Sequence, residues 1–173
     1  LQIGLVKVVE NDSNEVSIHD DYIPKSFNIG NWELIVKKVE EKQGFDFTEE
    51  QRAAIKLSLD NHVMALTGLA GAGKTSTANG ICSLYDDYNI LACALSGKAS
   101  VRITEATGLP ASTIHRALRY QNGEFMFNKE NKLAVDIVLI DEATMINGTL
   151  FLSLLEAIPT GAKVIIMGDV QQL

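Results

Sequence analysis

The fold is decided by one stretch, Gly68-Leu69-Ala70-Gly71-Ala72-Gly73-Lys74-Thr75, which matches the phosphate-binding pattern G-x-x-x-x-G-K-[ST] in full. An apolar run at 63–67 precedes it, and a helical pattern over 74–86 follows it. Glycines let successive backbone N–H groups turn inward towards phosphate oxygens, and the following helix adds the positive end of its dipole. The stretch therefore predicts a strand–loop–helix unit that binds nucleotide phosphates, in preference to a purely structural glycine-rich turn.

Short apolar runs alternate with helical patterns from residue 61 onward, which is typical of a parallel sheet. We expect strands near 63–67, 90–95, 136–140 and 163–167, and helices over 74–86, 98–107, 112–120 and 147–157. The polar stretch between Tyr120 and Ala134 contains Gly123 and an alternating Phe125-Met126-Phe127, which is typical of a hairpin insertion. The sequence therefore predicts an α/β fold in which helices flank a parallel sheet.

The first 45 residues differ in texture from the rest. Two β-rich pieces at 5–9 and 15–19 predict a small hairpin, and apolar residues at helical spacing over 32–39 predict a helix that Gly44 ends. A second helix is expected to begin at Thr48, with Gln51 completing a capping box. We therefore expect an N-terminal appendage at 1–45, the end of a preceding domain, and a nucleotide-binding domain at 46–173. The start at Leu1 and the stop at Leu173, directly after a motif, suggest a fragment.

Composition indicates an ordinary globular protein, with 46% hydrophobic and 21% charged residues over 173 positions. The sequence contains no run of about 18 apolar residues that would predict a membrane span, and its first residues lack the pattern of a signal peptide. Cys82 and Cys93 lie in apolar stretches without metal-ligand spacing, which favours two buried, reduced thiols and a cytoplasmic location.

Two residues are expected to complete the phosphate site around Lys74, whose amine would reach the β- and γ-phosphates. The hydroxyl of Thr75 would bind Mg²⁺, and that ion needs an outer carboxylate. Asp141 supplies one, because it ends the apolar run 137–140 and a strand there would deliver it to the carboxyl edge of the sheet. Glu142 follows and is a candidate for polarising the attacking water.

Several of these residues have a second interpretation. Two acids after a strand commonly start a helix, so Glu142 has a structural alternative. The polar end of the chain, Gly168-Asp169-Val170-Gln171-Gln172-Leu173, is either a solvated turn or part of the same cleft, where Gln172 would contact a γ-phosphate or a water. Gln51 either caps its own helix or presents its amide to the Watson–Crick edge of adenine.

The ordered motifs resemble those of superfamily 1B helicases. They are Gly68 to Thr75, Ser96-Gly97-Lys98-Ala99-Ser100, Thr113-Ile114-His115-Arg116, Asp141-Glu142-Ala143-Thr144-Met145 and Gly168 to Leu173. Thr107-Gly108, Thr113 to Arg116 and the run 157–162 look most like the RecD family, the exodeoxyribonuclease V alpha chain and its stand-alone relatives. The resemblance covers about residues 47–173, and its order and spacing are highly specific.

The resemblance implies the RecA-like P-loop fold and ATP-driven 5′ to 3′ translocation on single-stranded DNA. It implies Mg²⁺ bound by Thr75 and Asp141, catalytic roles for Lys74, Glu142 and Gln172, and a last strand that lies between the P-loop strand and the Asp141 strand. The residues expected to bind the nucleotide are Gln51, Gly68, Ala70, Gly71, Ala72, Gly73, Lys74, Thr75 and Ser76. It also implies a second RecA-like domain of the full-length chain, whose arginine completes the ATP site, and exonuclease complex subunits as partners. Without that arginine, ATP hydrolysis by a fragment is expected to be slow.

Charge is distributed unevenly along the chain. The formal net charge is −7, and residues 1–50 hold eleven acids and five bases whereas residues 51–173 hold eleven acids and ten bases. One cationic window, residues 96–120, contains four bases against the single acid Glu105. It coincides with the segments that the resemblance assigns to DNA, from which the expected contacts are Ser96, Lys98, Arg102, Thr113, His115 and Arg116. Solubility alone is the alternative for the bases, and His115 has a bracing role as its alternative.

Three functions are compatible with the P-loop. On the first hypothesis the chain is a DNA-stimulated motor ATPase. On the second it is an ATPase switch that acts on a protein partner without DNA. A small-molecule kinase is the third, but it leaves Thr113 to Arg116 and Gly168 to Leu173 unexplained.

Overall fold

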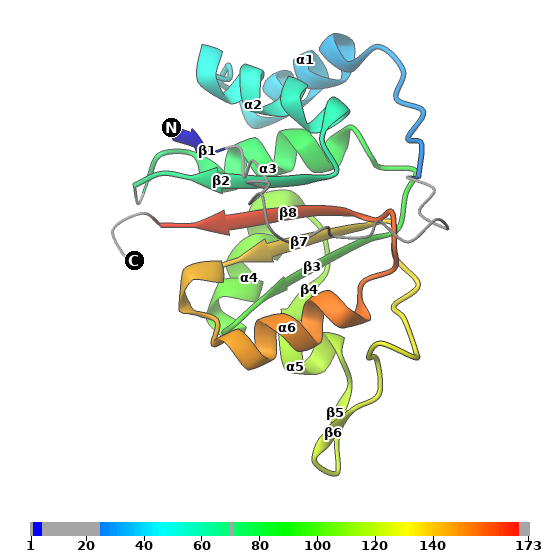
Figure 1. Cartoon of the computed structure of the whole chain (residues 1–173). Helices are drawn as coiled ribbons and strands as arrows, with labels where there is room; N and C mark the ends of the chain where they lie inside the picture. The colour runs from blue at the N-terminus through cyan, green and yellow to red at the C-terminus, as the bar shows by residue number, and fades with distance from the viewer. Residues whose placement is uncertain (1, 5–24, 70, 170–173) are drawn as a thin grey trace, which may run out of the picture.

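The computed structural model of the chain describes residues 2–4, 25–69 and 71–169. A six-stranded sheet forms its centre, in the spatial order β1-β2-β8-β7-β3-β4 (Figure 1). The strands are β1 (Gln2–Gly4), β2 (Val63–Thr67), β3 (Ile90–Ala94), β4 (Ala111–Thr113), β7 (Ile137–Asp141) and β8 (Lys163–Gly168). All neighbouring pairs from β2 to β4 are parallel, and β1 pairs antiparallel with β2. The expected position of the last strand is confirmed, because β8 lies between β2 and β7.

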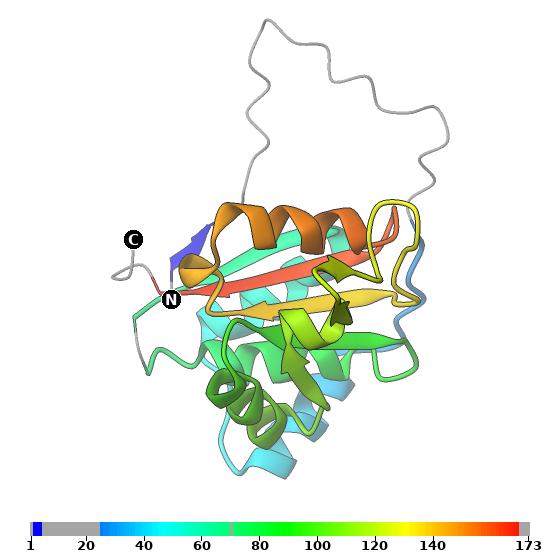
Figure 2. The same cartoon turned by 90° about the horizontal axis from the view of Figure 1, so that it is seen from below.

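Helices cover both faces of the sheet. They are α1 (Trp32–Gln43), α2 (Glu49–Asp60), α3 (Lys74–Ser83), α4 (Gly97–Thr107), α5 (Ile114–Ala117) and α6 (Gly148–Ala157), with a 3₁₀ turn, η1, at Ala143–Met145. Figure 2 shows α6 on one side of the sheet and α1 to α4 on the other. The α/β fold with a parallel sheet flanked by helices is therefore confirmed.

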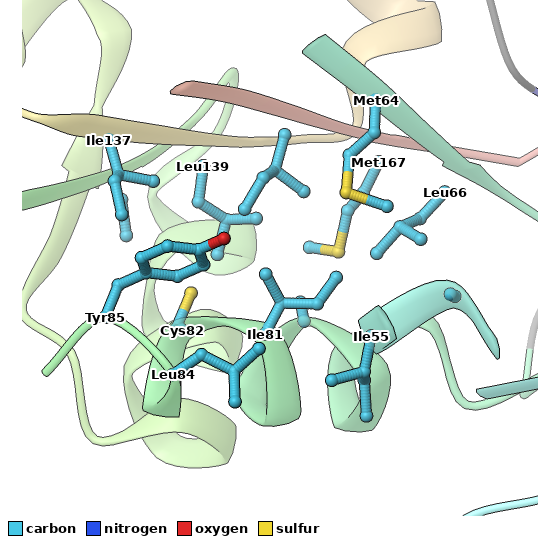
Figure 3. Close-up of a cluster of buried hydrophobic side chains, with 14 of the residues drawn as sticks. Ile55, Met64, Leu66, Ile81, Cys82, Leu84, Tyr85, Ile137, Leu139 and Met167 are labelled. Carbon is cyan, nitrogen blue, oxygen red and sulfur yellow. The ribbon is translucent and has the colours of Figure 1, made fainter. Parts of the chain in front are cut away.

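The alternation of side chains along β7 explains how one strand serves two layers. Ile137 and Leu139 are buried in the cluster formed with α1 to α4, whereas Val138 and Ile140 are buried in the cluster formed with α5 and α6. Figure 3 shows the first cluster, in which Ile137 and Leu139 lie over Tyr85 and Cys82 at the end of α3. Because both faces are covered, β7 is a continuous apolar run, as parallel strands usually are.

Helix α1, the last element of the expected appendage, packs against α3. Val36 and Val39 of α1 belong to the same buried cluster as Ile81 of α3. Gly44 ends α1 in the left-handed conformation at φ 81°, and Thr48 begins α2 as its N-cap, as expected. The expected hairpin at 5–9 and 15–19 lies outside the described residues.

Two of the helices predicted from the sequence differ from those in the structure. The helix expected over 74–86 ends at Ser83, where Leu84 and Tyr85 continue as turns. The helix expected over 112–120 is replaced by strand β4 and the short helix α5, because Thr113 adopts an extended conformation and caps α5 by accepting from the Arg116 N–H. The hairpin insertion is confirmed as β5 (Tyr120–Gln121) and β6 (Glu124–Phe125), joined by two residues with positive φ, Asn122 and Gly123. Arg119 therefore lies beyond α5, with a positive φ of 52°, directly before the hairpin.

Both cysteines are buried and free, as expected. Burial raises the pKa of each thiol to about 12. Among the described residues, no helix is long and apolar enough to cross a membrane.

Candidate functional site

The phosphate loop joins β2 to α3 and has the conformation that its glycines permit. Gly71 and Gly73 have φ values of 80° and 79°, a region that side chains with a Cβ rarely adopt. Gly73 is the N-cap residue of α3. Because glycine has no side chain, it does not cap the first N–H groups of α3, which face the loop. The local structure therefore forms the anion-binding end of a helix that the sequence predicted. Ala70 lies outside the described residues.

One cleft of about 380 Å³ collects most of the expected catalytic residues. It is lined by Gly71, Gly73, Lys74, Thr75, Ser76, Arg102, Asp141, Glu142, Gly168 and Asp169. The P-loop, the end of β7 and the end of β8 meet there because parallel strands place their carboxyl ends at one edge of the sheet. Lys74, Thr75, Asp141 and Glu142, expected from separate motifs, are thus brought together. Gln172 lies outside the described residues.

Lys74 folds back onto its own loop. Its Nζ donates to the carbonyl oxygens of Gly68 and Leu69 at 2.7 and 2.9 Å. The amine therefore has hydrogen-bond partners inside the cleft and lies where a phosphate oxygen would compete for it.

Asp141 ends β7 and is half-buried. Its Oδ1 accepts the Glu142 N–H at 2.8 Å. Burial raises the pKa of the Asp141 carboxyl, and the charge of Glu142 adds to that rise. The hydrogen bond from the Glu142 N–H and the charges of Arg102 and Lys74 oppose it. A carboxylate in this position is stabilised by added positive charge, which suits a cation ligand.

Glu142 has an unusual backbone conformation for a residue with a side chain, at φ 54° and ψ 34°. Its carboxylate pairs with Arg102 of α4 and also accepts from Ser96 Oγ at 3.3 Å. Sequence reasoning missed these contacts because Glu142 and its partners are at least 40 residues apart in the chain. They link the nucleotide cleft to the start of α4.

Gln51 satisfies both ends of its amide. Its Oε1 accepts the Thr48 N–H at 2.9 Å, which completes the expected capping box, and its Nε2 donates to the Gly73 carbonyl at 3.3 Å. A Cβ built on Gly73 would lie 2.3 Å from Gln51 Nε2, so any other residue would displace this amide, and the φ of 79° also favours glycine. The capping interpretation is confirmed, and the side chain also fixes α2 to the P-loop.

Ser76 and Asp169 both line the cleft, at positions that the sequence analysis offered for the nucleotide site. Ser76 Oγ donates to Gln43 Oε1 at 3.2 Å, which ties α3 to the end of α1. Asp169 lines the nucleotide cleft directly after β8. Its place at the end of the central strand was the available signal, but the same position also suits a solvated turn.

The expected DNA contacts fall into two groups. Ser96 and Arg102 lie against the nucleotide cleft through Glu142. The second group begins at the end of β4. It forms an open pocket of about 700 Å³ lined by Thr113, His115, Arg116, Arg119, Tyr120, Gln121 and Met126. Lys98 lies exposed on α4 and lines neither of these pockets.

The second group contains aromatic side chains that the sequence analysis did not assign to a binding surface. The His115 ring meets Tyr120 edge-on at 5.7 Å between centroids, and Tyr120 lies 4.9 Å from Phe125 of the hairpin. Tyr120 is 50% exposed. Its position directly after a basic segment was the only signal in the sequence, and only the hairpin brings Phe125 beside it.

The fold and the cleft together define a P-loop nucleotide-binding domain of RecA-like α/β architecture. The family described as AAA domain matches residues 51–173, and the chain belongs to this family. The ATP-dependent RecD2 DNA helicase of Deinococcus radiodurans is 35% identical over 152 residues, which cover 87% of this chain and 21% of that protein. The RecBCD enzyme subunit RecD of Mycolicibacterium smegmatis is 33% identical over 153 residues, covering 72% of this chain and 28% of that subunit.

A solved structure gives the same fold. The Pif1 helicase from Bacteroides superposes with a TM-score of 0.54 and 24% identity, over 76% of this chain and 34% of that chain. The chain thus spans about a fifth to a third of these three proteins. The expected resemblance to RecD-type helicase sequences is confirmed.

Proposed function

We propose that this chain is the ATP-binding motor domain of a 5′ to 3′ DNA helicase or translocase of RecD type, spanning residues 46–173, with α1 packed on its α3. The observation that carries the proposal is the single cleft that Lys74, Thr75, Asp141 and Glu142 line together. A phosphate-binding loop, two oxygen ligands and a separate carboxylate are the groups that ATP hydrolysis needs. RecD2 and RecD relatives at 33–35% identity support the same class of activity.

In this proposal, each residue of the cleft has a distinct role. The N–H groups of 71–76 and the Lys74 amine bind phosphate oxygens, and the Thr75 hydroxyl and Asp141 carboxylate hold Mg²⁺. Both ligands offer the hard oxygen atoms that this ion prefers, and Asp141 lies in a partly buried setting that favours a cation. When bound, Mg²⁺ neutralises charge on the phosphates. Glu142 orients and polarises the attacking water, and Gln172 contacts the γ-phosphate. Gln51 lies beside the adenine and contacts it with the second N–H and the second oxygen lone pair that its amide retains beside the cap.

Single-stranded DNA is the proposed partner of the residues beyond β3 and β4. Register pairs Ala94 with Thr113, so the segments that follow both strands leave the same edge of the sheet. Arg116 and Arg119 supply charge for the phosphate backbone, and Tyr120 supplies an exposed ring on which a base can stack. A second RecA-like domain and exonuclease subunits are the further proposed partners, and an arginine of that domain would complete the ATP site.

The test is the ATPase rate of the complete protein with and without single-stranded oligothymidine. We expect DNA to raise the rate many-fold and Lys74→Ala to lower it by about 100-fold or more, because the variant loses a preorganised donor to the phosphates. Lys56→Ala, an exposed lysine on α2, serves as the matched control and retains the rate. An ATPase rate that is the same with and without DNA would exclude the proposed motor function and favour a switch that acts on a protein.

A further inference from the structure

The carboxylate of Glu142 is held by one helix. Arg102 of α4 pairs with Oε1, and Ser96, the N-cap residue of α4, donates to Oε2 at 3.3 Å. Both carboxylate oxygens therefore accept hydrogen bonds from α4. A carboxylate with both oxygens engaged, and with its charge offset by a guanidinium, is a poorer acceptor for a proton of water.

The backbone of Glu142 is fixed independently of this pairing. Its N–H donates to Asp141 Oδ1 at 2.8 Å, and its carbonyl accepts the Met145 N–H at 3.0 Å within η1. The position of the carboxylate is therefore set by side-chain rotation and by its partners on α4.

Arg102 is accessible to a second anion. Its side chain is 56% exposed, whereas that of Glu142 is 24% exposed. A guanidinium binds a phosphodiester with the same two-pronged geometry that it uses for a carboxylate, and ion pairs this exposed are weak. Lys98 lies exposed four residues earlier on the same helix and provides a second charge for a DNA backbone.

We propose that Arg102 is a positioning residue that withholds Glu142 from the attacking water until a DNA phosphate takes its guanidinium. This inference rests on the proposed motor function and adds the route by which DNA raises the ATPase rate. Exchange of Arg102 from Glu142 to DNA frees Oε1 in the nucleotide cleft. One short contact between α4 and the end of β7 thus couples the two sites.

The experiment compares kcat and KM for ATP in the complete protein, with and without oligothymidine. Arg102→Met keeps the length of the side chain and removes the charge. We expect its DNA-free kcat to rise roughly 2- to 5-fold, the scale on which exposed ion pairs act, with KM for ATP unchanged and with a smaller ratio of stimulated to basal rate. Arg102→Lys keeps a cation and is expected to return the DNA-free kcat towards that of the unsubstituted protein.

Two comparison variants separate this role from plain DNA binding. Lys98→Met is expected to raise the oligothymidine concentration needed for half-maximal stimulation and to retain a large stimulation ratio. Lys56→Met removes an exposed charge from α2 and controls for net charge. If Arg102→Met only raises the oligothymidine concentration needed for half-maximal stimulation and its DNA-free kcat does not rise, Arg102 is a simple DNA contact, and the inference is wrong while the motor function stands. If DNA fails to stimulate the unsubstituted protein, the motor function and this inference fall together.

Discussion

At the scale of single residues, Lys163 shows how strongly the fold can constrain a charge. The side chain lies at the start of β8, is 1% exposed, and donates from Nζ to the carbonyl oxygens of Ser58, at 2.5 Å, and Asn61. These carbonyls end α2, where a helix favours a cation. The amine also lies 5.3 Å from the ring centroid of Phe27 and 5.4 Å from that of Tyr85. Lys163 therefore connects β8, α2 and the segment before α1.

The titration of Lys163 gives a testable pH dependence. Burial lowers its pKa from 10.5 to about 8, so between these values the unfolded chain binds one proton more than the folded chain at this site. The free energy of unfolding should therefore rise with pH across this window, by at most about 1.4 kcal/mol per pH unit from this group. Urea unfolding of the unsubstituted protein and of Lys163→Met at about pH 7 and about pH 9 measures it.

Comparison with the variant isolates the lysine, because the thiols and tyrosines titrate in both proteins. We expect the stability difference between the unsubstituted protein and Lys163→Met to move in favour of the unsubstituted protein at the higher pH. A difference that stays constant with pH would mean that Lys163 titrates at its ordinary value when folded.

The sequence predicted which residues line the cleft better than it predicted the contacts between them. Gly73, Lys74 and Thr75 belong to a pattern whose spacing fixes their geometry, so their meeting with Asp141 followed from strand direction alone. The pairing of Arg102 with Glu142 depends on how α4 packs across the end of β7. No local spacing encodes that contact, and the sequence analysis predicted Arg102 only as a DNA contact within a cationic window.

At the scale of elements, α2 illustrates how a helix start supports a distant loop. Thr48 Oγ accepts the Gln51 N–H at 3.3 Å, and Gln51 in turn reaches Gly73 in the P-loop. Thr48→Ala removes the cap and should lower the free energy of unfolding by about 1 kcal/mol. Thr48→Ser retains a hydroxyl and should recover most of the loss. Urea unfolding of both variants tests this, and equal stabilities for alanine and serine would show that the cap contributes nothing.

The elements that sequence patterns missed are those that are too short to carry a period. Strand β4 has three residues, and Thr113 belongs both to its end and to the cap of α5. The single helix predicted over 112–120 therefore covered the end of a strand, a helix cap and one helical turn. The longer strands β2, β3, β7 and β8 were predicted to within a residue or two, because each is an apolar run bounded by polar residues.

At the scale of the whole molecule, the net charge of −7 opposes a polyanionic partner. Binding of DNA must then rely on a local group of bases, of which Arg116 and Arg119 line one pocket with the exposed Tyr120. Each phosphate contact to a single strand releases counterions, so affinity falls linearly on logarithmic axes as salt increases, with a slope of about −0.7 per contact. The acidic residues elsewhere in the chain repel DNA at long range without contacting its phosphates, so they do not change the number of phosphate contacts that sets the slope.

This argument predicts a measurable change in slope. Arg116→Ala should make the salt dependence of oligothymidine binding shallower by about 0.7, since one phosphate contact is lost. Lys37→Ala removes an equal charge from α1, across the sheet from α5 (Figure 1), and should leave the slope unchanged. Fluorescence anisotropy over a range of salt concentrations gives both slopes. If the two variants shift the slope equally, only net charge matters and the pocket beside the hairpin is not a DNA contact. A shift confined to Arg116→Ala assigns the contact to that edge of the sheet.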